Sequence, residues 1–137
     1  MDKLRAIEGF GGGGGSAKQV YVAGNFSHSS GSNRFMALSN DLTAATEGPT
    51  QMRMPLAGKI NYLNIHLDVN TDPTNRTYLI RLNGADSALT VEVTGSTAGD
   101  YNETTEVTFA VGDLITIQVP GTTNVHQGTV QVGVEYS

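Results

Sequence analysis

The chain has 137 residues and no cysteine, which suits one domain and excludes both a disulfide scaffold and a thiolate metal site. Its formal net charge is −5, and no apolar run approaches the length of a membrane helix, so we expect neither nucleic acid nor a membrane as a partner. Only 15% of the residues are charged, whereas Thr, Ser, Asn and Gly are abundant, a composition closer to extracellular or virion β-proteins than to cytosolic enzymes.

Residues 1–18 are expected to form an N-terminal arm. The first ten residues lack the apolar stretch of a secretory signal. They place three apolar side chains at intervals of three residues, at Leu4, Ile7 and Phe10. A decapeptide cannot bury these by itself, so we expect the arm to bind a different chain. A run of glycines would serve as the hinge of the arm, because glycine chains behave as flexible tethers: Gly11, Gly12, Gly13, Gly14 and Gly15.

Residues 19–137 are expected to form one domain of short β-strands. Apolar and polar residues alternate in QVYVAGNF, NRFMAL, TQMRMP, KINYLNIHLD, RTYLIRLN, ALTVEV, EVTFAV, DLITIQV and TVQVGVEY. This alternation puts Met52 with Met54, and Phe109 with Val111, on one face of their strands. Gly, Pro, Asn and Asp separate the segments, and helical periodicity is limited to a single turn near MDKLRAIE or DLTAATE. The pattern predicts an all-β fold, an antiparallel two-sheet sandwich of about eight strands.

Two local features refine this prediction. In KINYLNIHLD the apolar phase slips by one position, from Ile60 and Tyr62 to Leu63, as a β-bulge would produce. In VGD, Gly112 permits a tight turn with positive φ, and Asp113 can accept hydrogen bonds from the amides around that turn. The apolar residues that follow are then expected to enter the core: Ile115, Ile117 and Val119.

The segment DVNTDP begins like a calcium-binding loop, with Asp68, Asn70 and Asp72 at the first three ligand positions. The match then ends. Pro73 occupies the position of the required glycine, and Leu79 occupies that of the bidentate glutamate. We therefore interpret the segment as a turn between two strands, capped by Asn and Asp side chains.

The histidines give no catalytic or metal-binding signature. His28, His66 and His126 are isolated, and none has the His-x-His or His-x-x-His spacing of a metal site. His66 alternates with apolar neighbours and is expected on the outward face of its strand. His28 is flanked by three serines, Ser27, Ser29 and Ser30. Since a triad also needs an orienting acid and an oxyanion pocket, we interpret this stretch as a polar loop and expect no enzyme and no cofactor.

Three longer segments resemble the small structural proteins of tailed bacteriophages: MPLAGKINYLNIHLD, YLIRLNGADSALTVEVTG and VTFAVGDLITIQV. The resemblance covers roughly Val20 to Tyr136. The GDLITIQV corner is also similar to tumour-necrosis-factor-like and complement-like trimeric jelly rolls. These likenesses imply a jelly-roll domain over residues 19–137 and a homotrimer, for which Tyr62 and Tyr136 are the candidate contacts.

The resemblance implies a virion protein, made in the host cytoplasm and then assembled on the particle. Our first hypothesis is a capsid decoration, or cement, protein that binds and stabilises the assembled phage head through the major capsid protein or another virion protein. The alternative is a head-fibre or tail recognition module that binds a host-surface carbohydrate or receptor. Exposed aromatic rings would favour the alternative, and Tyr21 and Tyr101 are the candidates for such rings.

Overall fold

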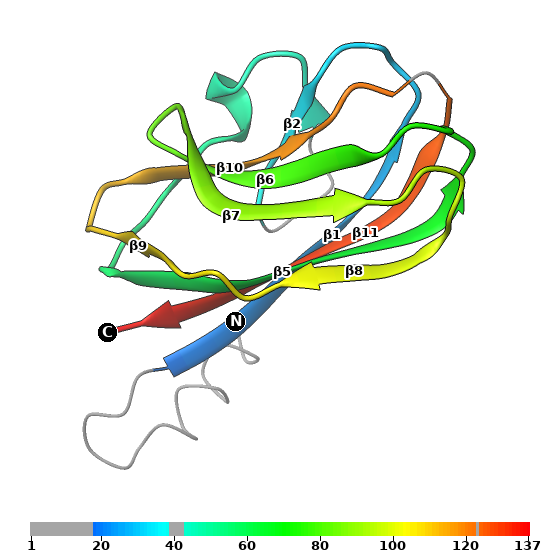
Figure 1. Ribbon diagram of the computed structural model, residues 1–137. Helices are drawn as coiled ribbons and strands as arrows, with labels where there is room; N and C mark the ends of the chain where they lie inside the picture. The colour runs from blue at the N-terminus through cyan, green and yellow to red at the C-terminus, as the bar shows by residue number, and fades with distance from the viewer. Residues whose placement is uncertain (1–17, 39–42, 123) are drawn as a thin grey trace.

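The computed structural model describes residues 18–38, 43–122 and 124–137 (Figure 1). The expected arm anchors Leu4, Ile7 and Phe10, and the glycine hinge 11–15, lie outside these residues. Strand β1 begins at Lys18, close to the predicted start of the domain.

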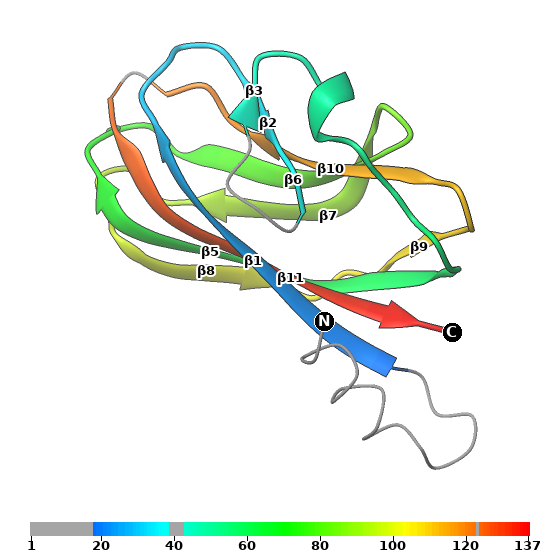
Figure 2. The same ribbon diagram turned by 180° about the vertical axis from the view of Figure 1, so that it is seen from behind.

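Two antiparallel sheets face each other in the described part of the chain (Figures 1 and 2). The first sheet has the order β1-β11-β5-β8, with β9 also paired to β5, and the second has the order β3-β2-β10-β6-β7, with β4 also paired to β10. The first sheet comprises β1 (Lys18–His28), β5 (Gly58–Asn70), β8 (Gly99–Glu103), β9 (Val107–Phe109) and β11 (His126–Tyr136). The second comprises β2 (Arg34–Met36), β3 (Thr43–Ala44), β4 (Met52–Arg53), β6 (Arg76–Leu82), β7 (Ala85–Val93) and β10 (Leu114–Val119).

The strand order is that of a jelly roll. The chain passes between the sheets repeatedly, so that β11, the last strand, lies between β1 and β5, and β10 lies between β2 and β6. The only helical element in the described residues is a 3₁₀ turn, Gly48–Thr50. The predicted all-β sandwich is therefore confirmed. None of the described helical structure is long or apolar enough to cross a membrane.

The core lies between the two sheets and consists of apolar side chains from both of them. Leu89, Val91 and Val93 are buried in β7 as the alternation predicts. The prediction is wrong for two residues, Met52 and Val111, which do not share the buried face of their neighbours. Met52 is 39% exposed while Met54 is buried, because β4 ends at Arg53 and the backbone of Met54 bonds to the turn at residues 112–113 instead. Val111 is 66% exposed because β9 already ends at Phe109.

The predicted β-bulge is present in β5, one residue earlier than the apolar pattern suggests. Tyr62 lies opposite Gly133 of β11, and Ile60 lies opposite Val134, so Asn61 is the extra residue. Ile60 therefore faces the core while Tyr62 turns outward. A second register shift leaves Asp68 unpaired near the other end of the strand.

The predicted corner at VGD is also confirmed. Gly112 has φ +89°, and the Asp113 carboxylate accepts hydrogen bonds from the Ala110 amide at 2.8 Å and the Asn83 side chain at 3.1 Å. These bonds, the backbone one first, lower the pKa of Asp113. The corner delivers β10 into the core.

Candidate functional site

A pair of tyrosines lies on the outer face of the first sheet. Tyr21 of β1 and Tyr62 of β5 are both register partners of Gly133, which lies on the intervening strand β11. Their rings meet edge to face across this glycine, with centroids 6.1 Å apart and planes at 85°. Tyr21 is 58% exposed, so the pair is accessible to a partner. Aromatic side chains at such positions are typical of binding interfaces.

An amide pair lies beside the tyrosines and also bridges β1 and β5. The Gln19 side chain donates to Asn61 Oδ1 at 3.2 Å, and Asn61 Nδ2 donates to Gln19 Oε1 at 3.0 Å. The bridge depends on Gly133, since a Cβ there would lie 2.8 Å from Tyr62 Cβ and 3.0 Å from both amides. Because Asn61 is the extra residue of the bulge, its amide lies on the same outer face as Tyr62. We call Gln19, Tyr21, Asn61 and Tyr62 the tyrosine patch.

Ionised groups lie at the two ends of this outer face. Near the β5 start, Lys59 pairs with Glu106 at 2.7 Å and with Glu135 at 3.4 Å. Toward the other end of the face, His66 lies 2.9 Å from Asp100 and 3.0 Å from Asp68. The tyrosine patch itself carries no formal charge.

His66 faces outward, as the alternation predicts. Its hydrogen bond to Asp100, followed by the one to Asp68, raises the pKa of the imidazole. The charged form of His66 is therefore favoured in the folded state, and the two carboxylates that bond it are exposed.

Strand β1 has one free edge in the described structure. It pairs with β11 in unbroken register from Lys18 to His28, and no other described strand pairs with it. Residues 19–28 contain no Lys, Arg, Asp, Glu or Pro. Natural proteins block long edge strands with such residues or cover them, because an open edge pairs with other chains.

The two candidate trimer contacts lie on opposite faces of the sheet. Tyr62 belongs to the outer face, whereas Tyr136 packs against the core with its ring 6.2 Å from that of Phe109. Burial raises the pKa of Tyr136. The other candidate ring, Tyr101, also packs against the core and donates its hydroxyl to the Thr97 carbonyl at 2.8 Å. Of the rings singled out from the sequence, Tyr21 is the strongly exposed one.

A polar cluster is buried at the far end of β1. His28 and His126 are register partners on β1 and β11, and both point inward. Tyr78 stacks on the His126 ring, and its hydroxyl lies 2.7 Å from His126 Nδ1. The expectation of a polar loop around His28 is therefore wrong for the histidine itself. His28 is the last residue of β1 and its side chain faces inward, whereas Ser29 and Ser30 begin the loop.

Asp72 completes this cluster and is fully buried. Its carboxylate accepts hydrogen bonds from Arg76 Nε and Thr122 Oγ1, both at 2.6 Å, and from the Thr74 amide at 2.9 Å. The Asp72 amide in turn donates to Asn70 Oδ1 at 3.2 Å. The predicted turn capped by Asn and Asp side chains is confirmed. Among the described residues, no group of three or more His, Cys, Asp or Glu side chains gathers as metal ligands would.

Burial determines the protonation of the two inward histidines. Desolvation lowers the pKa of His28, helped by the charge of Arg34 and opposed by the carbonyls of Ser32 and Pro120. Desolvation also lowers the pKa of His126, where Asp72 opposes it. Both imidazoles are therefore neutral at neutral pH. The Nε2 atoms of both rings have no hydrogen-bond partner in the described structure.

The sequence signals for these sites were weak but present. Gly133 interrupts the alternating segment TVQVGVEY, and a glycine inside a strand indicates close approach of neighbouring groups. Gln19, Asn61 and Arg34 gave no comparable signal, because each belongs to a polar position of an ordinary strand pattern.

Comparisons with known proteins do not assign the chain to a family. No family model and no curated protein sequence matches it. Among solved structures, it is similar to a family 35 carbohydrate-binding module from Clostridium thermocellum, with a TM-score of 0.41 and 14% sequence identity. The match covers 60% of this chain and 65% of that protein, slightly less than two thirds of its length. A likeness at this level carries no conclusion about ligand or partner.

Proposed function

We propose that the protein is a non-enzymatic structural protein of a virion, a capsid decoration protein that binds and stabilises an assembled bacteriophage head. The class of partner comes from the resemblance of three segments to phage structural proteins. The observation that carries the proposal is the free edge of β1, which has no formal charge over residues 19–28 and lies beside the tyrosine patch.

The free edge requires a cover. After Lys18, residues 19–28 of β1 offer an edge without the charges or proline that prevent edge-to-edge pairing. The same strand presents Tyr21 on its outer face, and tyrosine is among the residues that dominate binding energy at protein interfaces. An open strand edge beside an exposed aromatic ring suits a protein that binds another chain along this surface.

The proposed arm would extend this surface. Residues 1–17 precede Lys18, which lies opposite Tyr136 and two residues before Val20. Leu4, Ile7 and Phe10 would anchor on a neighbouring capsid subunit, with the glycines as the hinge. Each buried anchor contributes roughly 1.5–3 kcal/mol, which ordering the glycines largely offsets at about 1–2 kcal/mol per residue. A homotrimer would overcome this weak balance through multivalence, and binding only the assembled shell would stabilise it by mass action.

Binding to purified empty heads tests the proposal. Deletion of residues 1–15 is expected to leave the thermal midpoint unchanged and to abolish or strongly weaken binding. Tyr21→Ser is expected to weaken binding as well, whereas Val111→Ser, which alters an exposed apolar side chain away from β1, serves as the matched control. Sedimentation of the free protein tests the trimer. Full binding by both the truncated chain and Tyr21→Ser would refute the proposal.

A recognition module of a head fibre or tail is the second candidate, and the tyrosine patch is the observation that favours it. Two aromatic rings beside two amides around a side-chain-free glycine can offer apolar contact together with hydrogen bonds to hydroxyl groups. Binding of the intact chain to an immobilised glycan panel distinguishes the two. Glycan binding that Tyr21→Ser abolishes, without any binding to heads, would select this second function.

A further inference from the structure

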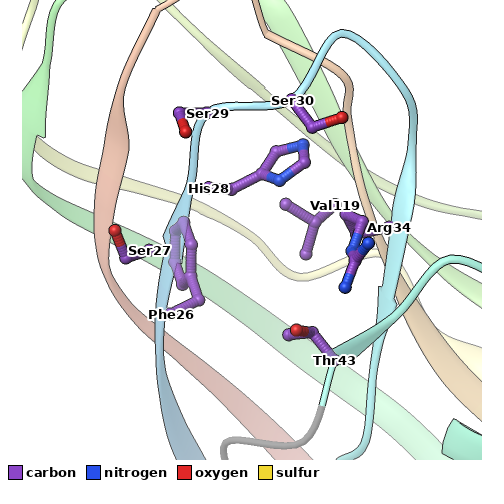
Figure 3. Close-up of a pocket in the computed structure, with 8 residues that line it drawn as sticks. All are labelled: Phe26, Ser27, His28, Ser29, Ser30, Arg34, Thr43 and Val119. Atoms are coloured by element: carbon purple, nitrogen blue, oxygen red, sulfur yellow. The ribbon is translucent and has the colours of Figure 1, made fainter.

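A pocket opens on the side of the sandwich, between β1, the edge strand of one sheet, and the last two strands of the other, β2 and β3 (Figure 3). Its volume is about 210 Å³. His28 and Ser29 line it from β1 and the following loop, Arg34 lines it from β2, and Thr43 lines it from β3. Phe26 and Val119 supply the apolar part of the lining.

The described lining offers hydrogen-bond donors and contains no carboxylate. Arg34 supplies a permanent positive charge, and Ser30 and Thr43 supply hydroxyls, whereas the Ser27 side chain points away from the pocket (Figure 3). This is unusual in a chain whose net charge is −5.

Arg34 is one of two described arginines without a carboxylate partner; the other, Arg53, bonds to the Gly112 carbonyl and does not line the pocket. Lys59, Arg76 and Arg81 each pair with at least one carboxylate. Arg34 is half-buried and forms no ion pair within the described residues. A guanidinium in this position can form paired hydrogen bonds to one anionic group, since its donors have the geometry of a fork.

His28 provides an independent indication of a ligand. Its side chain projects from β1 into the space between Ser30 and Arg34 (Figure 3). The residue is 7% exposed, and its Nε2 atom has no partner among the described residues. A buried polar atom without a partner costs free energy, which an oxyanion accepting a hydrogen bond from the ring would recover.

We propose that this pocket binds a small oxyanion, a carboxylate or phosphate group, held by the Arg34 guanidinium with donation from His28 and the surrounding hydroxyls. The volume lies below the usual range of about 300–1,000 Å³ for drug-sized ligands, so the pocket suits a single anionic group, free or at the end of a larger molecule. The site shares no residue with the tyrosine patch, and its test does not depend on the capsid proposal.

Titration of the full chain with inorganic phosphate and with acetate, at constant ionic strength set by chloride, tests the site. Chemical shifts of the His28 ring report binding in the pocket. Arg34→Gln is expected to weaken the preferred anion about tenfold or more, because a hydrogen bond to a charged group is lost. Arg53→Gln is the matched control, since it removes the same charge from an arginine that bonds only to the Gly112 carbonyl among described residues.

The two anions distinguish the ligand class, with tighter acetate binding indicating a carboxylate and tighter phosphate binding indicating a phosphate. Thr43→Val provides a second variant that removes a donor without changing the charge, and it is expected to weaken binding less than Arg34→Gln does. The proposal is overturned if neither anion shifts the His28 ring, or if Arg34→Gln and Arg53→Gln weaken binding equally.

Discussion

The two ends of β1 show opposite uses of polar side chains. Near its start, Tyr21 points outward and joins an amide-lined patch on the surface. At its end, His28 points inward beside His126 and is nearly excluded from water. The alternation of one strand therefore supplies both a surface for a partner and a component of the buried cluster.

The contrast between the two ends of β1 separates residues expected to stabilise the fold from residues expected to bind a partner. Groups in the histidine cluster have lost their hydration, so each missing partner there costs folding free energy. Groups in the tyrosine patch remain partly hydrated, and substitutions there change folding little. Variants at the two ends are therefore expected to separate stability from binding.

The largest effect is expected for Asp72→Ala. This change removes the buried carboxylate that Arg76, Thr122 and the turn amide bond, and breaking a buried ion pair from one side costs about 3–5 kcal/mol. Urea denaturation measures the loss. The control is Asp68→Ala, which removes an exposed carboxylate from the nearby end of β5 and is expected to cost at most about 1 kcal/mol. If the two variants lost the same free energy of unfolding, the buried carboxylate of Asp72 would contribute no more to stability than an exposed one.

Gly133→Ala is expected to cost about 1–3 kcal/mol, because overpacking forces neighbours to shift. The new Cβ would lie 2.8 Å from Tyr62 Cβ and would push apart the two sides of the tyrosine patch. Gly31→Ala is the control, since a Cβ there meets no atom within 4 Å. Thermal denaturation compares them, and an unchanged midpoint for Gly133→Ala would contradict the close approach.

Acid is expected to destabilise the protein through the histidine cluster. Because the folded pKa values of His28 and His126 are lowered, the unfolded chain takes up protons first as the pH falls below about 6.5. Stability is therefore greatest above that pH and falls toward the lowered folded pKa values. The groups facing the two rings are Arg34, Asp72, Arg76 and Tyr78.

His66 is expected to act in the opposite direction. Its raised pKa contributes stability that is fully present below about pH 6.5 and is lost as the pH rises through the folded pKa. His66→Gln is therefore expected to steepen the loss of stability in acid. Urea denaturation between neutral and mildly acidic pH measures both effects, and a flat profile in His66→Gln, where the opposing contribution is absent, would count against the buried pair.

The smallest effect on folding is expected for Tyr21→Ser, within about 0.5 kcal/mol, because its exposed ring contributes little to the core. Tyr101→Ser in β8, at the other edge of the sheet, is expected to cost several times more, since that ring packs against the core. Denaturation midpoints compare the two. If Tyr21→Ser destabilised the protein as much, the patch would be a structural element rather than a free surface.

Local patterns in the sequence predicted most of the strands, the presence of the bulge and the corner, but not where the short strands β4 and β9 end. Each depends on residues close together in the chain: alternation defines a strand face, a slip in that alternation indicates a bulge, and Gly112 with Asp113 defines a turn. The position of the bulge was less certain, because Tyr62 is compatible with either face. Only its pairing with Gly133 decided that it turns outward.

The sites were decided by the tertiary structure. Tyr21 meets Tyr62, and His28 meets His126, only because the last strand inserts between β1 and β5 in one register. Nothing near His126 in the chain indicates that Tyr78 stacks on its ring or that Asp72 lies close enough to influence its charge. Alternation determines which side of a strand a residue takes, but pairing between distant segments determines its neighbours, and those neighbours determine its burial, its charge and what it can bind.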